Sequence, residues 1–143
     1  VLNSKLVKGE VPANASVVYC KENYEALAKD PRNTFLLMTL KDAKGKVLSE
    51  EIYYFNYPKD QELPVAKVSY KVKQMDGKCE VTLSTKQLAR DIFIEIPVQG
   101  ARFTDNFFDL LPGQTKKIVI TSDKIKKNEP VQLKLRHLKG IIK

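Results

Sequence analysis

Acid–base chemistry is the first function to test in this chain, because carboxylates occur in it as close pairs. The pairs are Glu50/Glu51, Asp91/Glu95 and Asp105/Asp109. Two carboxyl groups that share a hydrolytic reaction must face one pocket, about 5 Å apart in the closest arrangement. Glu50 and Glu51 are consecutive, and consecutive side chains of a strand point to opposite faces. Closeness in sequence therefore does not build a catalytic pair, and we predict no catalytic residue.

Other reactive groups are scarce. The chain has one histidine, His137, and two cysteines, Cys20 and Cys79, which are too few for a tetrahedral zinc site. We predict no metal and no cofactor, since the dinucleotide, P-loop, HExxH and GxSxG motifs are missing from the sequence. The cysteines lack the tryptophan that accompanies an immunoglobulin disulfide, so we expect free thiols. We expect His137 to be a half-buried side chain at the end of a strand.

Positive charge is concentrated near the end of the chain. The net charge is +8, and residues 114–143 hold nine Lys or Arg against two acids, Asp123 and Glu129. Such a segment could meet an acidic domain or a nucleic acid. Most of its lysines alternate with apolar residues, as on the solvated face of a strand, and no nucleic-acid-binding motif accompanies them. We therefore predict no nucleic-acid partner.

The apolar runs and the start of the chain bear on its surroundings. The longest apolar runs, such as 35–38, are far shorter than the ~20 residues that span a membrane, so we predict no membrane span. The chain opens Val-Leu-Asn-Ser-Lys, without the basic start and apolar stretch of a signal peptide. We expect it to be a piece of a longer protein, and its compartment stays open.

The elements that must position these residues begin with a β-hairpin. The β-rich runs 34–42 and 46–56 are joined by Ala43-Lys44-Gly45, a connection of hairpin length that ends in glycine. A short strand is expected at 16–20. Apolar residues at helical spacing predict a short helix within 23–29.

Aromatic residues gather at the end of this hairpin. Tyr53, Tyr54 and Phe55 are consecutive, and Tyr57 follows. Side chains alternate between the faces of a strand, so two of the four are expected in a core and two exposed. We name Tyr53, Tyr54 and Tyr57 as a candidate aromatic surface that stacks on sugar or packs against a domain. The alternative that the sequence favours is an aromatic rim over a sandwich core.

A complete β-module is predicted after a linker. Residues 58–64 are polar, flanked by prolines and free of periodicity, so we place there the boundary between domains 1–63 and 64–143. Asp76-Gly77 predicts a hairpin with a type I′ turn, in which both central residues have positive φ. Short strands at near-regular spacing predict an all-β fold, an immunoglobulin-like β-sandwich. The strands are expected at 65–75, 78–84, 91–97, 101–104, 116–121 and 130–138.

The stretch from Ala101 to Gly113 is the densest in aromatic, acidic and turn-forming residues. Asp105 and Asn106 have side chains that bond nearby backbone and favour a turn. Leu111-Pro112-Gly113-Gln114 predicts a type II turn, because proline sets φ at the second position and glycine supplies positive φ at the third. We predict a pinned corner between two strands. Its marker residues are Phe103, Asp105, Asn106, Phe107, Phe108, Asp109, Pro112 and Gly113.

The sequence ARFTDNFFDLLPGQ at this corner resembles the C-terminal immunoglobulin-like domain of glycoside hydrolase family 2 β-mannosidases. The similarity extends back through VSYKVKQMDGKCEVTLSTKQLARDIFIEIPVQG and forward through KKIVITSDKIKK, and it looks closest to the enzymes of Bacteroides-type bacteria. Residues 1–63 resemble the later strands of the sandwich that precedes the terminal one. The resemblance implies one partial and one complete immunoglobulin-like sandwich.

The resemblance also implies a function for the longer protein. Such a parent is a glycosidase of carbohydrate metabolism that removes terminal β-linked mannose with retention, through two glutamates of a barrel domain outside this chain. The chain is then expected to be a non-catalytic accessory fragment that packs on other domains of a bacterial periplasmic or secreted parent. The alternative is a carbohydrate-binding module that uses exposed aromatics. A partial sandwich exposes sheet edges, which predicts pairing with a second copy.

Overall fold

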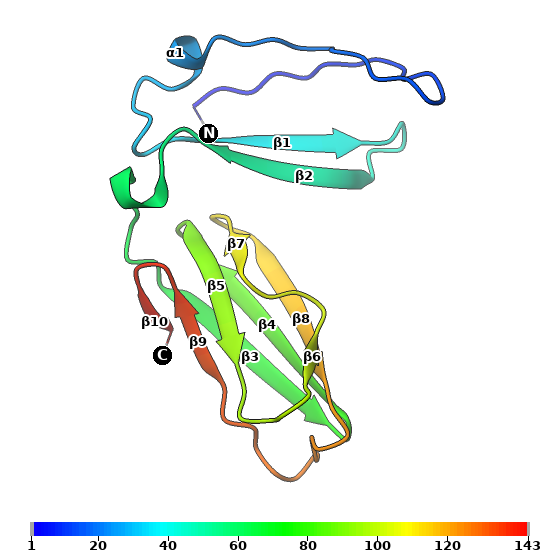
Figure 1. Ribbon diagram of the computed structural model, residues 1–143, viewed down its shortest axis with the longest axis vertical. Coiled ribbons are helices and arrows are strands. Elements are labelled where there is room, and N and C mark those ends of the chain that lie inside the picture. The colour runs from blue at the N-terminus through cyan, green and yellow to red at the C-terminus, as the bar shows by residue number, and fades with distance from the viewer. Residues whose placement is uncertain (1, 143) are drawn as a thin grey trace. The chain divides into compact units, whose positions relative to one another are not determined.

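The chain folds as two compact units. The computed structural model describes residues 2–142, apart from the side chains of Tyr24, Ile141 and Ile142. The units are Val1–Glu62 and Leu63–Lys143. In the described part, strands in antiparallel sheets dominate over two short helical turns (Figure 1). This confirms the prediction of an all-β, immunoglobulin-like fold. Neither helical turn has the length and apolar character that a membrane crossing requires.

The first unit contains the predicted hairpin. β1 (Phe35–Lys41) pairs antiparallel with β2 (Val47–Tyr54). Asp42 closes the turn, because its Oδ1 accepts two backbone N–H groups of the turn at 2.9 Å. Gly45 has a φ of 83°, a left-handed conformation that glycine adopts without strain. Among the described residues, β1 and β2 pair with each other and with no third strand.

One helical turn precedes the hairpin. α1 (Tyr24–Leu27) lies inside the range 23–29 that the sequence predicts. Its start is capped by Asn23, whose Oδ1 accepts the backbone N–H of Glu25 at 2.8 Å.

The prediction of a strand at 16–20 is wrong. Residues 2–22 run without regular structure, although Lys5 and Glu22 form an ion pair at 2.5 Å. Val17 and Val18 are adjacent and both exposed, so neither face of this stretch is buried. A β-rich sequence needs a buried face or a paired neighbour to hold a strand, and this one has no strand partner in the described chain.

The segment predicted as a linker, 58–64, is partly structured. Its first residues form a 3-10 helix, η1 (Pro58–Asp60). Glu62 is then bound to the first unit, because its N–H donates to the carbonyl of Arg32 at 3.1 Å and its carboxylate pairs with the Arg32 guanidinium at 3.1 Å. Asn33 adds a third bond, from Nδ2 to Glu62 Oε2 at 3.0 Å.

The second unit is a two-layer sandwich. One sheet has the strand order β3-β4-β8-β6 and the other β10-β9-β5-β7, and Figure 1 shows the two layers face to face. The strands are β3 (Val68–Met75), β4 (Lys78–Thr85), β5 (Ala89–Glu95), β6 (Arg102–Phe103), β7 (Phe108–Leu110), β8 (Thr115–Thr121), β9 (Lys134–His137) and β10 (Gly140–Ile142).

The core lies between these two sheets. Alternate residues of the long strands are buried, as the period of two in β4 and β8 requires. Every second side chain therefore enters the core and the others face solvent. The fully buried side chains with the largest volumes are Leu83, Ile92, Ile94, Leu110, Ile118, Ile120, Ile125, Leu135, Val81 and Cys79.

The second unit differs from expectation in two additional strands, one strand start and one turn type. The short strands β7 and β10 were not expected. The strand expected at 130–138 begins only at Lys134, because the N–H of Val131 donates to the side-chain oxygen of Gln74 at 3.1 Å rather than to a neighbouring strand. The predicted hairpin at Asp76-Gly77 is present. The prediction of a type I′ turn is wrong, since Gly77 has positive φ and Asp76 does not.

Tertiary contacts explain the altered turn. The N–H of Gly77 donates to the carbonyl of Ile125 at 2.8 Å, and its carbonyl accepts the N–H of Ser122 at 3.1 Å. The Asp76 carboxylate accepts the N–H of Lys127 at 2.9 Å. A loop far along the chain thus selects the turn geometry.

Candidate functional site

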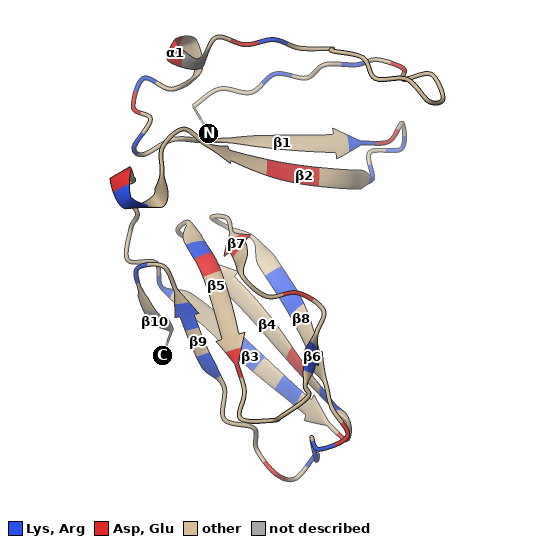
Figure 2. Ribbon diagram, in the orientation of Figure 1, with Lys and Arg blue, Asp and Glu red and all other residues tan. Residues whose placement is uncertain are grey.

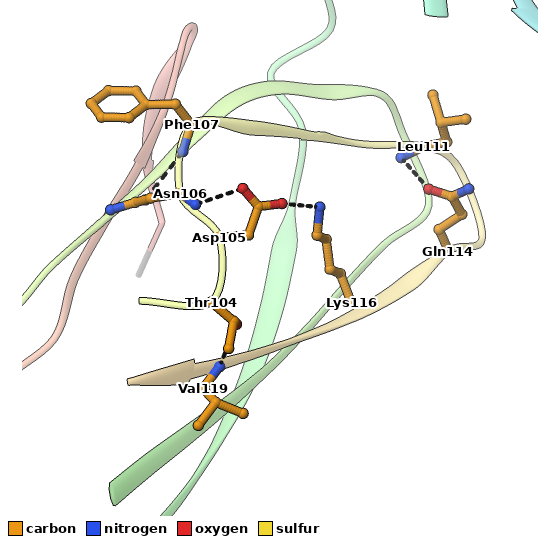
Figure 3. Close-up of polar contacts among 8 residues, drawn as sticks. All are labelled: Thr104, Asp105, Asn106, Phe107, Leu111, Gln114, Lys116 and Val119. Atoms are coloured by element: carbon orange, nitrogen blue, oxygen red, sulfur yellow. Dashed lines mark hydrogen bonds and ion pairs between the residues drawn. The ribbon is translucent and has the colours of Figure 1, made fainter. Parts of the chain in front are cut away.

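The marker stretch carries the chain from one sheet of the second unit to the other. β6 pairs with β8 in the first sheet, whereas β7 pairs with β5 in the second. Thr104 to Phe107 span the crossing (Figure 3). The backbone N–H of Thr104 donates to the carbonyl of Val119 at 2.9 Å, and Thr104 Oγ1 accepts the Val119 N–H at 3.0 Å. The crossing therefore starts from a fixed point on β8.

Asp105 makes the next contacts. Its Oδ1 accepts the backbone N–H of Asn106 at 2.8 Å, and its Oδ2 lies 2.6 Å from Lys116 Nζ. The side chains of Asp105 and Lys116 are 44% and 36% exposed, so solvent screens the pair and it contributes little to stability. Asp105 orders the crossing locally, as Figure 3 shows.

The side chain of Asn106 takes the place of one residue of β7 in the pairing with β5. Its Oδ1 accepts the N–H of Ile94 at 2.8 Å, and its Nδ2 donates to the carbonyl of Ile94 at 2.9 Å. β5 and β7 pair through Ile92↔Phe108, and the next position in this register is Ile94 opposite Asn106. The side-chain amide thus satisfies the backbone groups that one more residue of β7 would satisfy.

The two phenylalanines of the motif face different surroundings. Phe108 is buried in the core, and Lys116 Nζ lies 4.2 Å from its ring centroid. Phe107 is 69% exposed and stacks on Phe93 with centroids 4.6 Å apart. Phe107 also has a φ of 58°, a left-handed conformation that is unusual for a bulky residue. Its N–H donates to Asn106 Oδ1 at 3.2 Å, which helps to hold that conformation.

Asp109 supports an irregularity in β5. Its Oδ1 accepts the N–H of Asp91 at 2.8 Å, and its Oδ2 lies 3.7 Å from Arg90 Nε. Asp91 has a φ of 52°, and the β5–β7 register shifts between Ala89 and Ile92. The carboxylate therefore stabilises a bulge, a feature that often redirects a strand.

The end of the motif forms the predicted type II turn. The N–H of Gln114 donates to the carbonyl of Leu111 at 3.0 Å, and Gly113 has a φ of 81°. The N–H of Gly113 donates to the carbonyl of Thr85 at 2.8 Å, which attaches the turn to β4. Phe103, before the crossing, is half-buried against the core.

Carboxylates that are close in sequence make different structural contacts. Asp105 binds Lys116, whereas Asp109 binds the amide of Asp91. Glu50 and Glu51 lie on opposite faces of β2, as the period of two predicts. The described residues contain no group of three or more His, Cys, Asp or Glu that could hold a metal ion.

The remaining reactive side chains lie apart from the motif. Cys20 is an exposed free thiol, and Cys79 is a buried one whose pKa is raised by burial. His137 is buried at the end of β9, where its Nδ1 accepts the N–H of Lys139 at 3.2 Å. Burial lowers the pKa of His137, which favours the neutral imidazole in the fold. The position at a strand end is confirmed, whereas the expected half-burial is wrong, because the side chain is buried.

Part of the positive charge of the second unit is carried by exposed lysines of two strands, Lys71 and Lys73 of β3 and Lys117 of β8. Figure 2 shows blue bands on both strands, which pair with β4 on either side. Glu80, in the strand between them, lies 2.7 Å from Lys117 Nζ and 2.6 Å from Lys78 Nζ. Hydrogen bonds from Lys117 and Lys78 lower the pKa of Glu80 to about 2.

The candidate tyrosines do not share one surface. Tyr53 and Tyr54 are neighbours in β2 and point to opposite faces of the hairpin. Tyr53 packs edge-on against Phe55 at 5.3 Å between centroids, whereas Tyr54 lies 6.0 Å from Phe35. Tyr57 is 75% exposed beyond the strand.

Each of the two units matches the model of a known protein family. Residues 63–141 match the model of Ig_mannosidase, an Ig-fold domain, and residues 1–60 match Mannosidase_ig, the mannosidase Ig/CBM-like domain. A search of curated proteins gave no match. The first match covers more than half of the chain and coincides with the two-layer sandwich. The chain therefore belongs to the family of Ig-fold domains of mannosidases.

Proposed function

We propose that this chain is a non-catalytic accessory region of a glycoside hydrolase family 2 β-mannosidase, and that its role is to pack on other domains of that enzyme. The parent would hydrolyse terminal β-D-mannose from mannosides with retention. The observation that carries the proposal is the pair of family matches, which follow each other along the chain as mannosidase Ig-like domains.

The contacts of the marker motif support a structural role. Asn106 bonds the backbone of Ile94, and Asp109 bonds the backbone of Asp91. These polar groups are already bonded within their own domain. A catalytic carboxylate instead faces a pocket where it meets substrate.

Two measurements test the proposal. The purified chain should not hydrolyse an aryl β-mannoside, and measurable turnover would refute the non-catalytic role. Deleting residues 63–143 from the parent should lower its thermal stability and leave its kcat/KM for the same substrate nearly unchanged, because a packing domain touches no reacting atom. A parent that loses activity while its catalytic domain stays folded would contradict the packing role.

We also propose that the first unit pairs with a second copy of itself through the hairpin. β1 and β2 each have one edge without a strand partner among residues 2–142, and unpaired edges recruit other strands. Leu40 and Leu48 are also exposed on this hairpin. Light scattering should show a fraction of dimers that increases with protein concentration. A monomer at every concentration would refute the pairing.

A further inference from the structure

The outer face of the sheet β10-β9-β5-β7 carries a row of side chains that the packing role does not explain. Phe93 lies between two buried isoleucines of β5, so its side chain points away from the core. Arg136 is its partner across the β5–β9 ladder and shares that face. The Arg136 guanidinium lies 5.8 Å from the Phe93 ring centroid, and Phe107 stacks on the same ring at 4.6 Å.

The backbone of Phe107 is the unusual part of this row. Its φ of 58° is disfavoured for an aromatic residue, and glycine or asparagine would hold it at less strain. The ring is 69% exposed, so burial compensates little for that strain. Strained residues cluster at sites that bind ligands. Here the left-handed backbone of Phe107 holds an aromatic ring in a position that faces solvent.

Polar groups of balanced charge lie beside the rings. Arg136 Nη2 lies 2.6 Å from Glu95 Oε2, and the two side chains are 53% and 41% exposed. The pair therefore offers both donors and acceptors to a ligand and no net charge. We propose that Phe107, Phe93, Arg136 and Glu95 form a binding surface for a neutral saccharide, whose apolar ring face lies on Phe107 and whose hydroxyls bond the ion pair.

Other ligands fit this surface less well. A nucleic acid brings phosphates that need a net cationic surface, whereas Glu95 neutralises Arg136 here. A stable protein interface covers about 800 Å² on each partner and centres on apolar residues. On this surface Phe107 is exposed, and the charged side chains of Arg136 and Glu95 lie beside it, so these residues form no broad apolar centre.

The test is an NMR titration of the whole chain with mannotriose, and with cellotriose as a second neutral saccharide. The backbone amides of residues 93–95, 106–108 and 136 should shift with a common binding curve. Phe107→Gly removes the ring and suits the left-handed backbone, so the variant should stay folded. It should weaken binding by up to about tenfold, because one aromatic contact contributes at most a change of that order. Phe107→Tyr keeps the ring and should bind like the native chain.

Three results would overturn the proposal. The first is the absence of shifts with either saccharide at millimolar concentrations. The second is equal binding by the native chain and the folded Phe107→Gly variant. The third is a set of shifts confined to Tyr53 and Tyr57, which would place saccharide binding in the first unit. None of these results bears on catalysis by the parent, so they are independent of the proposed accessory role.

Discussion

Replacing Asn106 by alanine should destabilise the second unit far more than any other change in the exposed part of the marker motif. The variant removes the two bonds that Asn106 makes to Ile94, at 2.8 and 2.9 Å. Ile94 is fully buried, so water cannot easily replace the lost partners. The N–H and carbonyl of Ile94 would then both be left unsatisfied.

The expected cost follows from those two groups. A buried backbone group without a partner costs about 1–3 kcal/mol, so Asn106→Ala should lower the free energy of unfolding by about 2–4 kcal/mol. In a unit of this size, 1 kcal/mol corresponds to roughly 4–8 °C in Tm, which predicts a fall of at least about 8 °C. Asp105→Ala is the matched control. Because Asp105 and Lys116 are both exposed, it should cost less than about 1 kcal/mol.

The assay must follow each unit separately, because a chain of two units does not have one unfolding equilibrium. The chain contains two methionines, Met38 in β1 and Met75 in β3. Carbon-13 labelled methionine methyls therefore give one NMR signal for each unit during urea unfolding. Asn106→Ala should move the midpoint of Met75 and leave that of Met38 in place.

One result would refute this reasoning. If Asn106→Ala moves the Met75 midpoint no further than Asp105→Ala does, the side-chain amide does not replace a strand residue. Asn106→Asp gives a second check. It keeps an acceptor for the Ile94 N–H and sets an oxygen against the Ile94 carbonyl, so it should also destabilise the unit at neutral pH.

Three further predictions concern the second unit. Gly113→Ala should cost about 1 kcal/mol, because φ is 81° there and the new Cβ meets no atom within 4 Å; Gly140→Ala, without positive φ, is the control. His137 has a lowered pKa in the fold, so the unfolded chain protonates first and stability should fall as pH drops below 6.5; His137→Gln should remove that step. Glu80, with a pKa of about 2, stabilises the unit above pH 4.5, and this contribution is lost as pH falls towards 2; Glu80→Gln should flatten the decline.

The Met75 signal also measures these effects. Equal costs at Gly113 and Gly140 would mean that backbone strain is not the cause. A pH step near 6.5 that persists in His137→Gln would have to come from another group. An unchanged decline between pH 4.5 and 2 in Glu80→Gln would show that the Lys117 and Lys78 contacts add nothing in solution.

Patterns among neighbouring residues were sufficient to predict strands with alternating side chains and one of the turns. The alternation of Val68, Tyr70 and Val72 predicts β3, and the same period in Cys79, Val81 and Leu83 predicts β4. The type II turn at 111–114 follows from proline and glycine alone, since each sets its own φ. These features depend on residues that are neighbours in the chain.

Features that depend on distant residues were not predictable. The role of Asn106 depends on the register of β7 against β5, which no local pattern contains. β7 has three residues, too few for an alternation to identify it. The valines at 17 and 18 have β-favouring side chains and yet form no strand, because propensity without a partner does not hold one. The stacking of Phe107 on Phe93 also requires the crossing to be known first.

The two glycine turns differ in how they would tolerate an inserted peptide. The turn at Gly45 is closed by Asp42, which lies three residues earlier in the chain. An added Cβ at Gly45 would meet no atom within 4 Å. The turn at Gly77 is bonded on both sides to residues 122–125. Epitope tags or fluorescent labels inserted after Lys44 should therefore leave the fold intact, whereas the same insertion at Gly77 would detach a loop almost fifty positions away.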